Sequence, residues 1–583
     1  MGRLSLSPKI LDVLDFGTPS AERDISRGLE KYFVESDAYQ RVRSGAKTIL
    51  MGNRGAGKSA IFKVLAKRER AAGSHVIELS PEDYSYELLS STMEAEDAGS
   101  WAKHGAYAAA WKYLIYILVM KALARKGMRL TKGGGREIHK YIRDNHGASQ
   151  LGTLSLLVSY LKRLEAIKIG PIEAGLRTRE LDRLYKLEEI QNLLPALRKV
   201  LDGQRVVVLV DELDRGWDSS EDAKAFVSGL FQACVSINAL HPNLRVYVSL
   251  RQELYDDIPA LYEDAQKHRD LLEKIYWSEE SLLELIAKRI RYSAHEKGFD
   301  VEALEQAGDR ACWSAVFASP PGQTRDGSFR YMVDRTLYRP REIIQFCSEA
   351  LAQARGRTSR LPVPYSAIER CEYGYSAERT KDIAAEYRSQ YPGLLSVFEV
   401  FRNHPHTFGR DQIELLCLEL AVGDIPTHGT ESWLPFCNPN DLIEVLWRAG
   451  LLTAEANASG RFLGSHQVQH LNLGAAKRFQ VHEMFRSALG IGTETGGSSP
   501  WLWPGSHRLR IQRAVRCRAV RVVVTTVRSG MMRWASVNTA ESWLVVTART
   551  VAPAARPAAM PAGASSMTMQ AAGSTPSRRA ARR

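Results

Sequence analysis

The sequence predicts an α/β fold built on a parallel β-sheet, and three observations carry this prediction. Short apolar runs that suit buried strands lie at 47–51, 75–79, 206–210 and 244–250. Segments with helical periodicity separate the runs, for example residues 222–240. The run at 206–210 has five consecutive apolar residues, four of them Val, which is typical of a central strand covered on both faces. Strands that alternate with helices form parallel sheets with right-handed crossovers.

The chain of 583 residues is long enough for several domains. We expect a core at 1–275 with a helical insertion at about 86–201, a helical lid at 276–390, a winged-helix-like domain at 391–490 and a disordered low-complexity tail at 491–583.

Two of these regions have a more detailed prediction. Residues 16–33 near the N-terminus are expected to form one helix with Ser20 as its N-cap. In the winged-helix-like domain, three helices would precede a β-hairpin. The strands of this hairpin would lie near 460–463 and 478–481.

The net charge of +13 is distributed unevenly along the chain. Residues 491–583 contain 14 Arg, two Glu and no Lys or Asp, a net charge of +12 that leaves +1 for residues 1–490. The basic overall composition is therefore no evidence that the folded body binds nucleic acid. Nucleic acid stays an open partner that the charge of the body does not support.

The cysteines and the most apolar segment indicate a cytoplasmic protein without a membrane partner. The seven cysteines occur singly, with no Cys-x-x-Cys pair, and the N-terminus has no apolar signal region. The apolar stretch at 106–124 is interrupted by Lys112 and Lys121, whereas a membrane span needs about 20 predominantly apolar residues. We expect a buried helix at 106–124, with a membrane span as the alternative.

The strongest motif has the form G-x-x-x-x-G-K-[ST], with a short apolar strand before it and a helix after it. Its residues, with the one that follows, are Gly52, Asn53, Arg54, Gly55, Ala56, Gly57, Lys58, Ser59 and Ala60. The glycines let backbone N–H groups face phosphates, and the helix N-terminus adds partial positive charge. We expect Lys58 to reach the β- and γ-phosphates and Ser59 to ligate Mg²⁺. The motif predicts a P-loop site for a nucleoside triphosphate.

Two carboxylates follow the apolar run at 206–210. Asp211, at the tip of the predicted strand, is expected to hold the Mg²⁺ shell, usually through water. Adjacent side chains at a strand end diverge, so Glu212 is the candidate general base for the attacking water. The alternative is a solvated strand end without a catalytic role.

The segment Asp211-Glu-Leu-Asp-Arg-Gly-Trp217 after a Val-rich strand resembles the Walker B segment of origin-recognition AAA+, STAND and KAP NTPases. With its Gly-Trp ending it is similar to a group of bacterial P-loop ATPases, and the resemblance covers roughly residues 10–490. It implies an ATP-hydrolysing switch that acts on a protein partner or effector chain, with bacterial anti-phage defence as one context. The spacing of 153 residues between Lys58 and Asp211 is long for a minimal AAA+ module, so hexamer formation is in doubt and the oligomeric state stays open.

The resemblance assigns two further positions. Arg251, directly after the 244–250 run, resembles a sensor 1 residue near the γ-phosphate, whereas the alternative is an arginine that caps a strand end. Residues 338–344 resemble a sensor 2 or lid motif, which places Arg341 or Arg339 over the nucleotide. The alternative for this segment is a helix start with surface charges.

Three functions remain open: an ATPase switch that converts ATP and water to ADP and phosphate, a DNA-associated AAA+-like motor or loader, and a P-loop kinase. The predicted recognition helix at 440–448 carries two carboxylates against one arginine, whereas DNA-contacting helices need cations. This composition favours an internal packing or signalling role for the winged-helix-like domain. No guanine-specifying Asn-Lys-x-Asp motif occurs in the sequence, which favours ATP over GTP.

Overall fold

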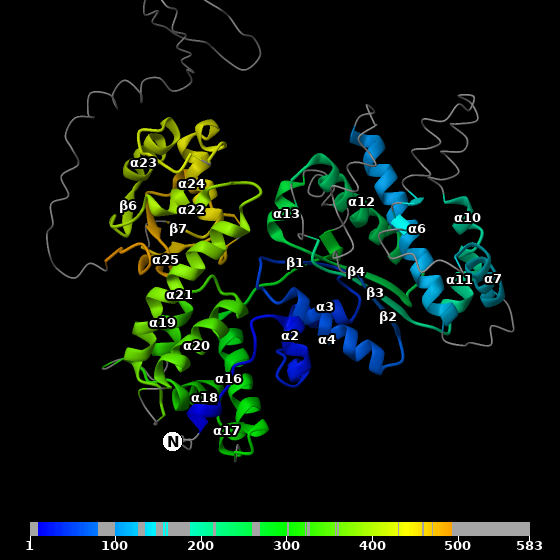
Figure 1. Cartoon of the computed structure of the whole chain (residues 1–583), viewed down its shortest axis with the longest axis horizontal. Helices are drawn as coiled ribbons and strands as arrows, with labels where there is room; N and C mark the ends of the chain where they lie inside the picture. Colours follow the sequence, from blue (N-terminus) through cyan, green and yellow to red (C-terminus); the bar gives the residue numbers. More distant parts are fainter. Residues whose placement is uncertain are drawn as a thin grey trace, which may run out of the picture. The chain divides into compact units, whose positions relative to one another are not determined.

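The computed structural model describes most of the chain between residues 10 and 492, and these residues belong to one compact unit, Met1–Thr495 (Figure 1). The described ranges are 10–79, 100–125, 134–146, 156–157, 159–160, 187–213, 217, 219–258, 269–299, 302–320, 322, 327–355, 357, 361–429, 431–456, 460–468 and 470–492. The predicted disordered tail lies outside the described residues except for its first two, and so does much of the predicted helical insertion.

The core is a five-stranded, fully parallel sheet in the order β2-β3-β4-β1-β5. The strands are β1 (Ile49–Met51), β2 (His75–Leu79), β3 (Val206–Val210), β4 (Leu244–Leu250) and β5 (Leu272–Lys274). The predicted parallel α/β core is confirmed with its first four strands, whereas β5 has no counterpart in the prediction. Because β4 lies between β1 and β3, the carboxyl ends of these three strands meet at one edge of the sheet.

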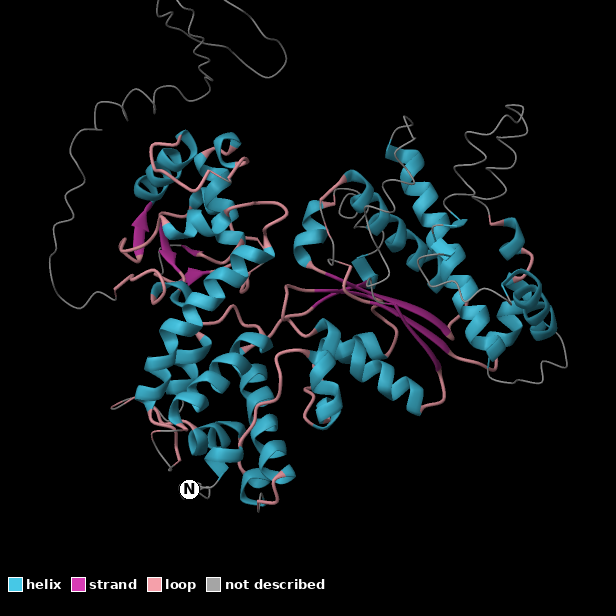
Figure 2. Cartoon of the chain, in the orientation of Figure 1, coloured by secondary structure: helices cyan, strands magenta, loops and turns pink. Residues whose placement is uncertain are grey.

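Helices cover both faces of the sheet, which explains why β3 is apolar at every position (Figure 2). Successive side chains of a strand point to opposite faces. Val207 and Leu209 accordingly pack with α3 (Asp37–Arg43) and α4 (Lys58–Ala71), while Val206, Val208 and Val210 pack with helices on the opposite face. The helices of that second face include α6 (Ser100–Arg125) and α12 (Glu221–Asn238).

Helix α6 is a core helix, as the lysine-interrupted apolar stretch predicts. Its residues Gly105–Ala124 are long and apolar enough to cross a membrane by length and composition, and 78% of the apolar window is buried inside the protein. The indole Nε1 of Trp111 donates a hydrogen bond to the carbonyl of Phe226 in α12, at 3.1 Å. Gly229 permits the close approach of the two helices, because a Cβ at this position would lie 2.7 Å from the Cβ of Tyr107. The other described helices of the predicted insertion are α7 (Gly134–His146), α10 (Glu188–Gln191) and α11 (Leu194–Leu201).

A helical region follows β5, as predicted for the lid. Its helices are α16 (Glu279–Glu296), α17 (Glu302–Gln306), α18 (Asp309–Val316), α19 (Gly327–Val333), α20 (Pro340–Ala354) and α21 (Tyr365–Glu386). They share one apolar core with α1 (Ile10–Val13) and with Phe16 near the N-terminus. The N-terminal residues therefore connect the lid to the sheet-containing core.

The prediction of one continuous helix over residues 16–33 is wrong. The structure has three short elements there: α2 (Ala21–Asp24) and the 3-10 helices at Ile25–Arg27 and Leu29–Lys31. Gly28, with a φ of 91°, breaks the helical path because it adopts the left-handed conformation. Ser20 stands at the N-cap position, but its side chain makes no capping hydrogen bond.

The C-terminal region carries a second, antiparallel sheet in the order β6-β9-β7-β8. Its elements are α22 (Leu394–Glu399), β6 (Thr407–Gly409), α23 (Arg410–Val422), α24 (Pro439–Arg448), β7 (Leu452–Glu455), β8 (Phe462–Leu463), β9 (Arg478–Val481) and α25 (Glu483–Arg486). The predicted hairpin between residues 460–463 and 478–481 is wrong, because both strands pair with β7 instead of with each other. All four residues of β7 are buried, which suits its place between them. The winged-helix assignment stays a prediction.

Candidate functional site

The loop between β1 and α4 curls tightly because two of its glycines adopt left-handed conformations. The φ angles are 81° at Gly55 and 99° at Gly57, in a region that L side chains rarely adopt. A Cβ at Gly55 would also lie 3.0 Å from the Cβ of Arg341. Gly57 is the N-cap of α4, a helix of 14 residues, and a helix N-terminus carries a partial positive charge and N–H groups that make no hydrogen bond within the helix. The local sequence thus forms a concave turn that suits an anion.

Lys58 stands at the first position of α4 with only 9% of its surface exposed. Its ammonium donates hydrogen bonds to the carbonyls of Gly52, at 2.5 Å, and Asn53, at 3.0 Å. The carbonyl of Ala56 accepts a hydrogen bond from the Nε1 of Trp277, at 2.8 Å. Loop carbonyls therefore direct the lysine side chain back across the loop, and a lid-side tryptophan supports the turn.

A cavity of about 410 Å³ opens at the carboxyl edge of the parallel sheet. It brings together the residues to which the sequence analysis assigned catalysis, metal binding or nucleotide sensing: Lys58, Ser59, Asp211, Glu212, Arg251 and Arg341. Arg54, Gly55, Gly57 and Ala60 also line the cavity, whereas Gly52, Asn53 and Ala56 do not. The three exceptions contribute carbonyls that hold Lys58 and Trp277 in place.

Asp211 and Glu212 enter the cavity through an unusual backbone turn after β3. The N–H of Asp211 donates to the carbonyl of Leu79 at 3.1 Å, which extends the β2–β3 ladder by one residue. Glu212 has a φ of 59°, and its N–H donates to the Asp211 carboxylate at 2.9 Å. A left-handed residue other than glycine costs on the order of 1–3 kcal/mol and is a mark of functional sites. Asp214, Arg215 and Gly216 of the predicted Walker B segment lie outside the described residues.

The sequence analysis left two lid arginines, Arg339 and Arg341, as alternatives over the nucleotide. The structure gives these two side chains different surroundings. The Nη1 of Arg339 donates to the Glu386 carboxylate at 2.8 Å and to the carbonyl of Arg54 at 3.2 Å. Arg339 is buried and does not line the large cavity. Arg341 does line it, and both burial and the nearby charge of Arg54 lower the pKa of Arg341. Two neighbouring cations on one wall of a cavity favour an anionic ligand.

Arg251 follows β4 directly and precedes the short helix α13 (Gln252–Asp257). It reaches the same cavity because β4 lies between the strands that carry the glycine loop and the Asp211–Glu212 pair. The structure thus places Arg251 at the cavity. Its two predicted roles, sensor 1 residue and strand-capping arginine, stay predictions.

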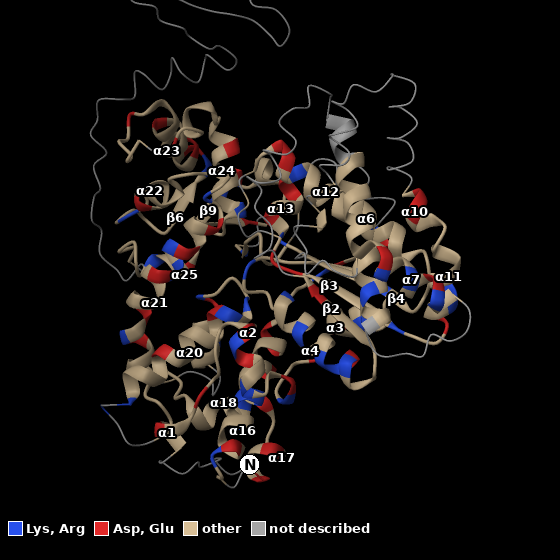
Figure 3. Ribbon diagram, turned by 45° about the vertical axis from the view of Figure 1, so that its right-hand side comes forward, with Lys and Arg blue, Asp and Glu red and all other residues tan. Residues whose placement is uncertain are grey.

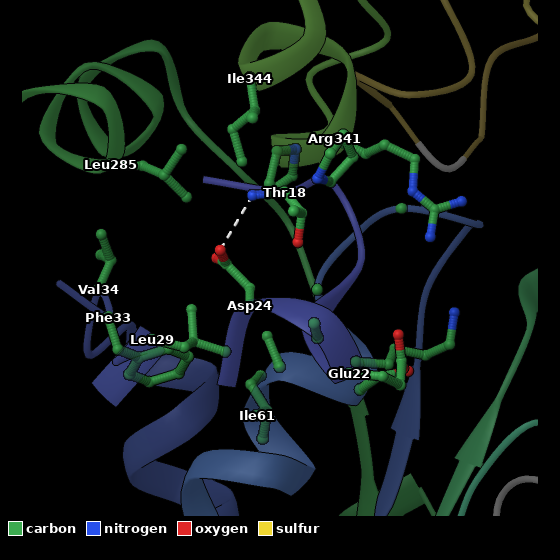
Figure 4. Close-up of a pocket in the computed structure, with 18 of the residues that line it drawn as sticks. Thr18, Glu22, Asp24, Leu29, Phe33, Val34, Ile61, Leu285, Arg341 and Ile344 are labelled. Atoms are coloured by element: carbon green, nitrogen blue, oxygen red, sulfur yellow. Dashed lines mark hydrogen bonds between the residues drawn. The ribbon is translucent and has the colours of Figure 1, made fainter. Parts of the chain in front are cut away.

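One end of the cavity is apolar, and the sequence analysis assigned none of its residues. Figure 4 shows Leu29, Phe33, Val34, Leu285 and Ile344 around this end, with Glu22 and Arg341 on the opposite side. Two of these residues come from lid helices α16 and α20, and three come from the segment before β1. No residue spacing in the sequence marks an apolar wall of this kind.

A buried ion pair holds the N-terminal segment against the lid beside this apolar end. The guanidinium of Arg289 in α16 pairs with Asp24 at 2.9 Å and also donates to the carbonyl of Phe16. The N–H of Thr18 donates to the Asp24 carboxylate at 2.9 Å. Gly17 is required in this turn, because a Cβ would lie 2.5 Å from the Arg289 guanidinium. The ion pair thereby positions the segment that supplies the apolar wall.

The oxygen ligands in the cavity suit Mg²⁺. Ser59 offers a hydroxyl and Asp211 a carboxylate, both on the cavity wall. The described residues contain no group of three or more His, Cys, Asp or Glu side chains that could hold a metal ion. Mg²⁺ is commonly bound by one or two carboxylates together with substrate phosphates and water, so this sparse ligand set fits a metal that arrives with a nucleotide.

Comparison with known proteins relates two parts of the chain to other sequences. Residues 280–384 match the family model of the FunZ-associated C-terminal helical domain, a segment that includes Leu285, Arg341 and Ile344 of the cavity wall. The putative transposon gamma-delta 80.3 kDa protein of Escherichia coli strain K12 is 23% identical over 409 residues, which is 67% of this chain and 54% of that protein. The chain therefore spans about half the length of this relative.

Two similar solved structures are those of the Aeropyrum pernix ORC2 protein. Its ADPNP–ADP complexes match with a TM-score of 0.32 and 10% identity, over 80% of this chain and 92% of that one. Its ADP form matches with a TM-score of 0.27 and 12% identity, over 78% and 89%. TM-scores of this size support no conclusion about shared fold or activity.

Proposed function

We propose that the chain binds ATP with Mg²⁺ in the large cavity and hydrolyses the ATP to ADP and phosphate. The observation that carries this proposal is the meeting of Lys58, Ser59, Asp211 and Glu212 at one cavity behind a curled glycine loop. The volume of about 410 Å³ lies within the range of about 300–1,000 Å³ that is usual for small-ligand sites. ATP is favoured over GTP only by the missing guanine motif in the sequence.

Each part of the cavity has a separate task in this proposal. The loop N–H groups and Lys58 bind the phosphates, while the apolar end receives the base. Ser59 and Asp211 would hold Mg²⁺, which neutralises phosphate charge when it is bound. Glu212 orients the attacking water and accepts its proton, a contribution of about 10²–10⁴-fold to the rate. Arg251 and Arg341 add positive charge around the γ-phosphate.

The lid contacts support a nucleotide-dependent switch. The N–H of Arg341 lies 3.5 Å from the carbonyl of Gly55, and the Arg339 guanidinium bonds the neighbouring carbonyl of Arg54. Just before these two arginines in the chain, Arg335 pairs with Glu483 of α25 at 2.9 Å. A change in the loop on nucleotide binding would therefore act on the lid directly and on the C-terminal region through it. We propose that a partner protein reads this change.

The decisive experiment measures ATP binding and turnover by the full chain with Mg²⁺, alongside the Lys58→Ala and Glu212→Gln variants. We expect the wild type to hydrolyse ATP and Lys58→Ala to lose nucleotide binding. Glu212→Gln should bind ATP without turning it over, because the amide keeps the shape but not the basicity. A wild-type chain that binds no ATP would contradict the proposal. Normal phosphate transfer by Glu212→Gln to an acceptor other than water would favour a P-loop kinase.

A DNA-associated motor or loader is the second candidate, favoured by the similarity to the Escherichia coli protein that is named after a transposon. Charge on the described residues gives it little support. Figure 3 shows Lys and Arg interspersed with Asp and Glu over the described helices. In α24, Arg448 is already paired with Glu444 at 2.6 Å. Duplex DNA that stimulates turnover with a steep salt dependence would establish this second candidate. Anti-phage defence stays a prediction from the resemblance alone.

A further inference from the structure

A second, smaller cavity of about 60 Å³ adjoins the proposed nucleotide cavity, and every residue on its wall is charged. Four of these residues are arginines: Arg54, Arg339, Arg341 and Arg379. Arg54 and Arg341 line both cavities, whereas Arg339 and Arg379 line only the smaller one. The small cavity therefore lies behind the proposed phosphate end of the nucleotide site.

The carboxylates of this small cavity are engaged by the two arginines that line it alone. The Nη1 of Arg339 contacts Glu386 at 2.8 Å, and its Nε lies 3.6 Å from Glu342. The Nη2 of Arg379 contacts Asp382 at 2.5 Å. With four arginines and three carboxylates, the wall carries a net charge of +1. The pKa of Arg341 is lowered by burial and by the charge of Arg54, so an anion beside these two arginines would stabilise both charged forms.

Two buried donors on this wall have no hydrogen-bond partner among the described residues: the Nε atoms of Arg339 and Arg379. These residues are only 5% and 7% exposed, so bulk water does not readily satisfy the two donors. A buried donor without an acceptor destabilises the fold, and buried polar groups are normally satisfied. The Nε of Arg339 faces the Glu342 carboxylate at 3.6 Å, so the Nε of Arg379 is the donor that indicates an acceptor atom inside the cavity.

The volume and the donors fit a tetrahedral oxyanion. A cavity needs at least about 10–15 Å³ of this kind of volume to hold one water, so about 60 Å³ leaves room for a small polyatomic anion. The planar forks of arginine are suited to phosphate oxygens, and such charge-assisted hydrogen bonds are about twice as strong as neutral ones.

We propose that the small cavity is a separate binding site for inorganic phosphate. This inference rests on the proposed function in one respect: phosphate released by hydrolysis would pass Arg54 and Arg341 and occupy the site before it leaves the protein. The lid arginines, Arg339 and Arg379, would then bond the product while the nucleoside diphosphate still occupies the loop. No covalent step occurs in the small cavity.

The test is calorimetric titration of the full chain with inorganic phosphate, with and without saturating ADP. We expect phosphate to bind the ADP-saturated protein, because Lys58 and Ser59 of the loop do not line the small cavity. Arg379→Gln should weaken phosphate binding at least tenfold and leave ADP affinity within twofold, since Arg379 does not line the nucleotide cavity. Arg388→Gln, at an exposed arginine farther along the same segment, is the matched control and should change neither affinity.

Arg379→Lys keeps the experiment decisive if the glutamine variant fails to fold. It retains the positive charge and an apolar stem but lacks the Nε donor, so phosphate binding should again fall at least tenfold. Phosphate that binds only in competition with ADP, or with unchanged affinity in a folded Arg379 variant, would overturn the inference. If only the proposed function is wrong, the result is distinguishable from these outcomes. ADP and ATP would then not bind, while phosphate binding would still depend on Arg379.

Discussion

The two ends of the large cavity are built in different ways. The phosphate end comes from the segments that directly follow β1, β3 and β4, so Lys58, Asp211 and Arg251 stand at the edge of one sheet. The apolar end combines Phe33 from the N-terminal segment with Ile344 from the lid. Phosphate binding demands particular residue types at particular spacings, whereas an apolar wall accepts any side chain of suitable size. A motif therefore marks the first end and not the second.

The lid adds a further difference, because one of its arginines is held in a buried ion pair and another lines the cavity. Arg339 is buried among carboxylates, while Arg341 faces the cavity two residues later. Four predictions test the differences between the two ends of the cavity and between the lid residues.

The largest effect is expected from Arg339→Ala. The substitution leaves Glu386 and Glu342 buried without their cation, and breaking a buried pair in this way costs about 3–5 kcal/mol. The free energy of unfolding, measured by denaturant titration, should fall by this amount. Arg341→Ala is the internal control, because the Arg341 side chain forms no ion pair with another described residue. Equal stability losses in both variants would contradict the contrast between the two arginines.

Arg341→Ala should instead weaken ATP binding. A hydrogen bond to a charged group contributes about 1.5–3 kcal/mol, which corresponds to a loss of affinity of roughly tenfold to a hundredfold. The free energy of unfolding should change by less than about 0.5 kcal/mol. Equilibrium binding of a fluorescent ATP analogue measures the first quantity, and thermal unfolding without nucleotide measures the second. Unchanged affinity would place the arginine outside the phosphate site.

Phe33→Ala should separate the two ends of the cavity. Phe33 is half-buried at the apolar end, so its loss should weaken ATP binding by about 1–1.5 kcal/mol, or roughly tenfold. Inorganic triphosphate has no base, and its affinity should stay within twofold of the wild-type value. Lys58→Ala is the opposite control, since it should weaken both ligands. Equal effects of Phe33→Ala on the two ligands would show that the apolar end does not hold the base.

The smallest effect concerns the pH dependence of the lid. Burial is the main cause that raises the pKa of Asp334 to about 6, above its usual value of 3.8. A carboxyl group with a raised pKa stabilises the fold while protonated, and this contribution is lost as the pH rises through 6. Asp334→Asn cannot ionise, so it should be more stable than the wild type at pH 8 by about 1 kcal/mol, after allowance for partial exposure. Thermal unfolding at pH 4 should show almost no difference; a constant difference across this range would contradict the assignment.

Sequence patterns predicted most of the core and the phosphate end. The apolar runs identified β1 to β4, and the glycine spacing placed Lys58 at the first turn of a helix. The short β5 escaped prediction because its three residues, Leu272–Lys274, alternate without a recognisable pattern. Strand β7 escaped as well, and without it the pairing of the C-terminal sheet was assigned wrongly. The helix expected over 16–33 from the N-cap signal at Ser20 is interrupted at Gly28, because nothing in that signal reveals the left-handed conformation of the glycine.

Local sequence patterns predict four strands of the core, the curled glycine loop and the acidic pair after β3, because each of these features depends on residues close together in the chain. The fold, by contrast, brings Arg341 to the cavity and buries Arg339, and it joins residues 29–34 to Leu285 and Ile344 in one wall. It also placed Arg379 beside Arg54 around a second cavity. These outcomes depend on packing between segments hundreds of residues apart, and no local spacing encodes such contacts.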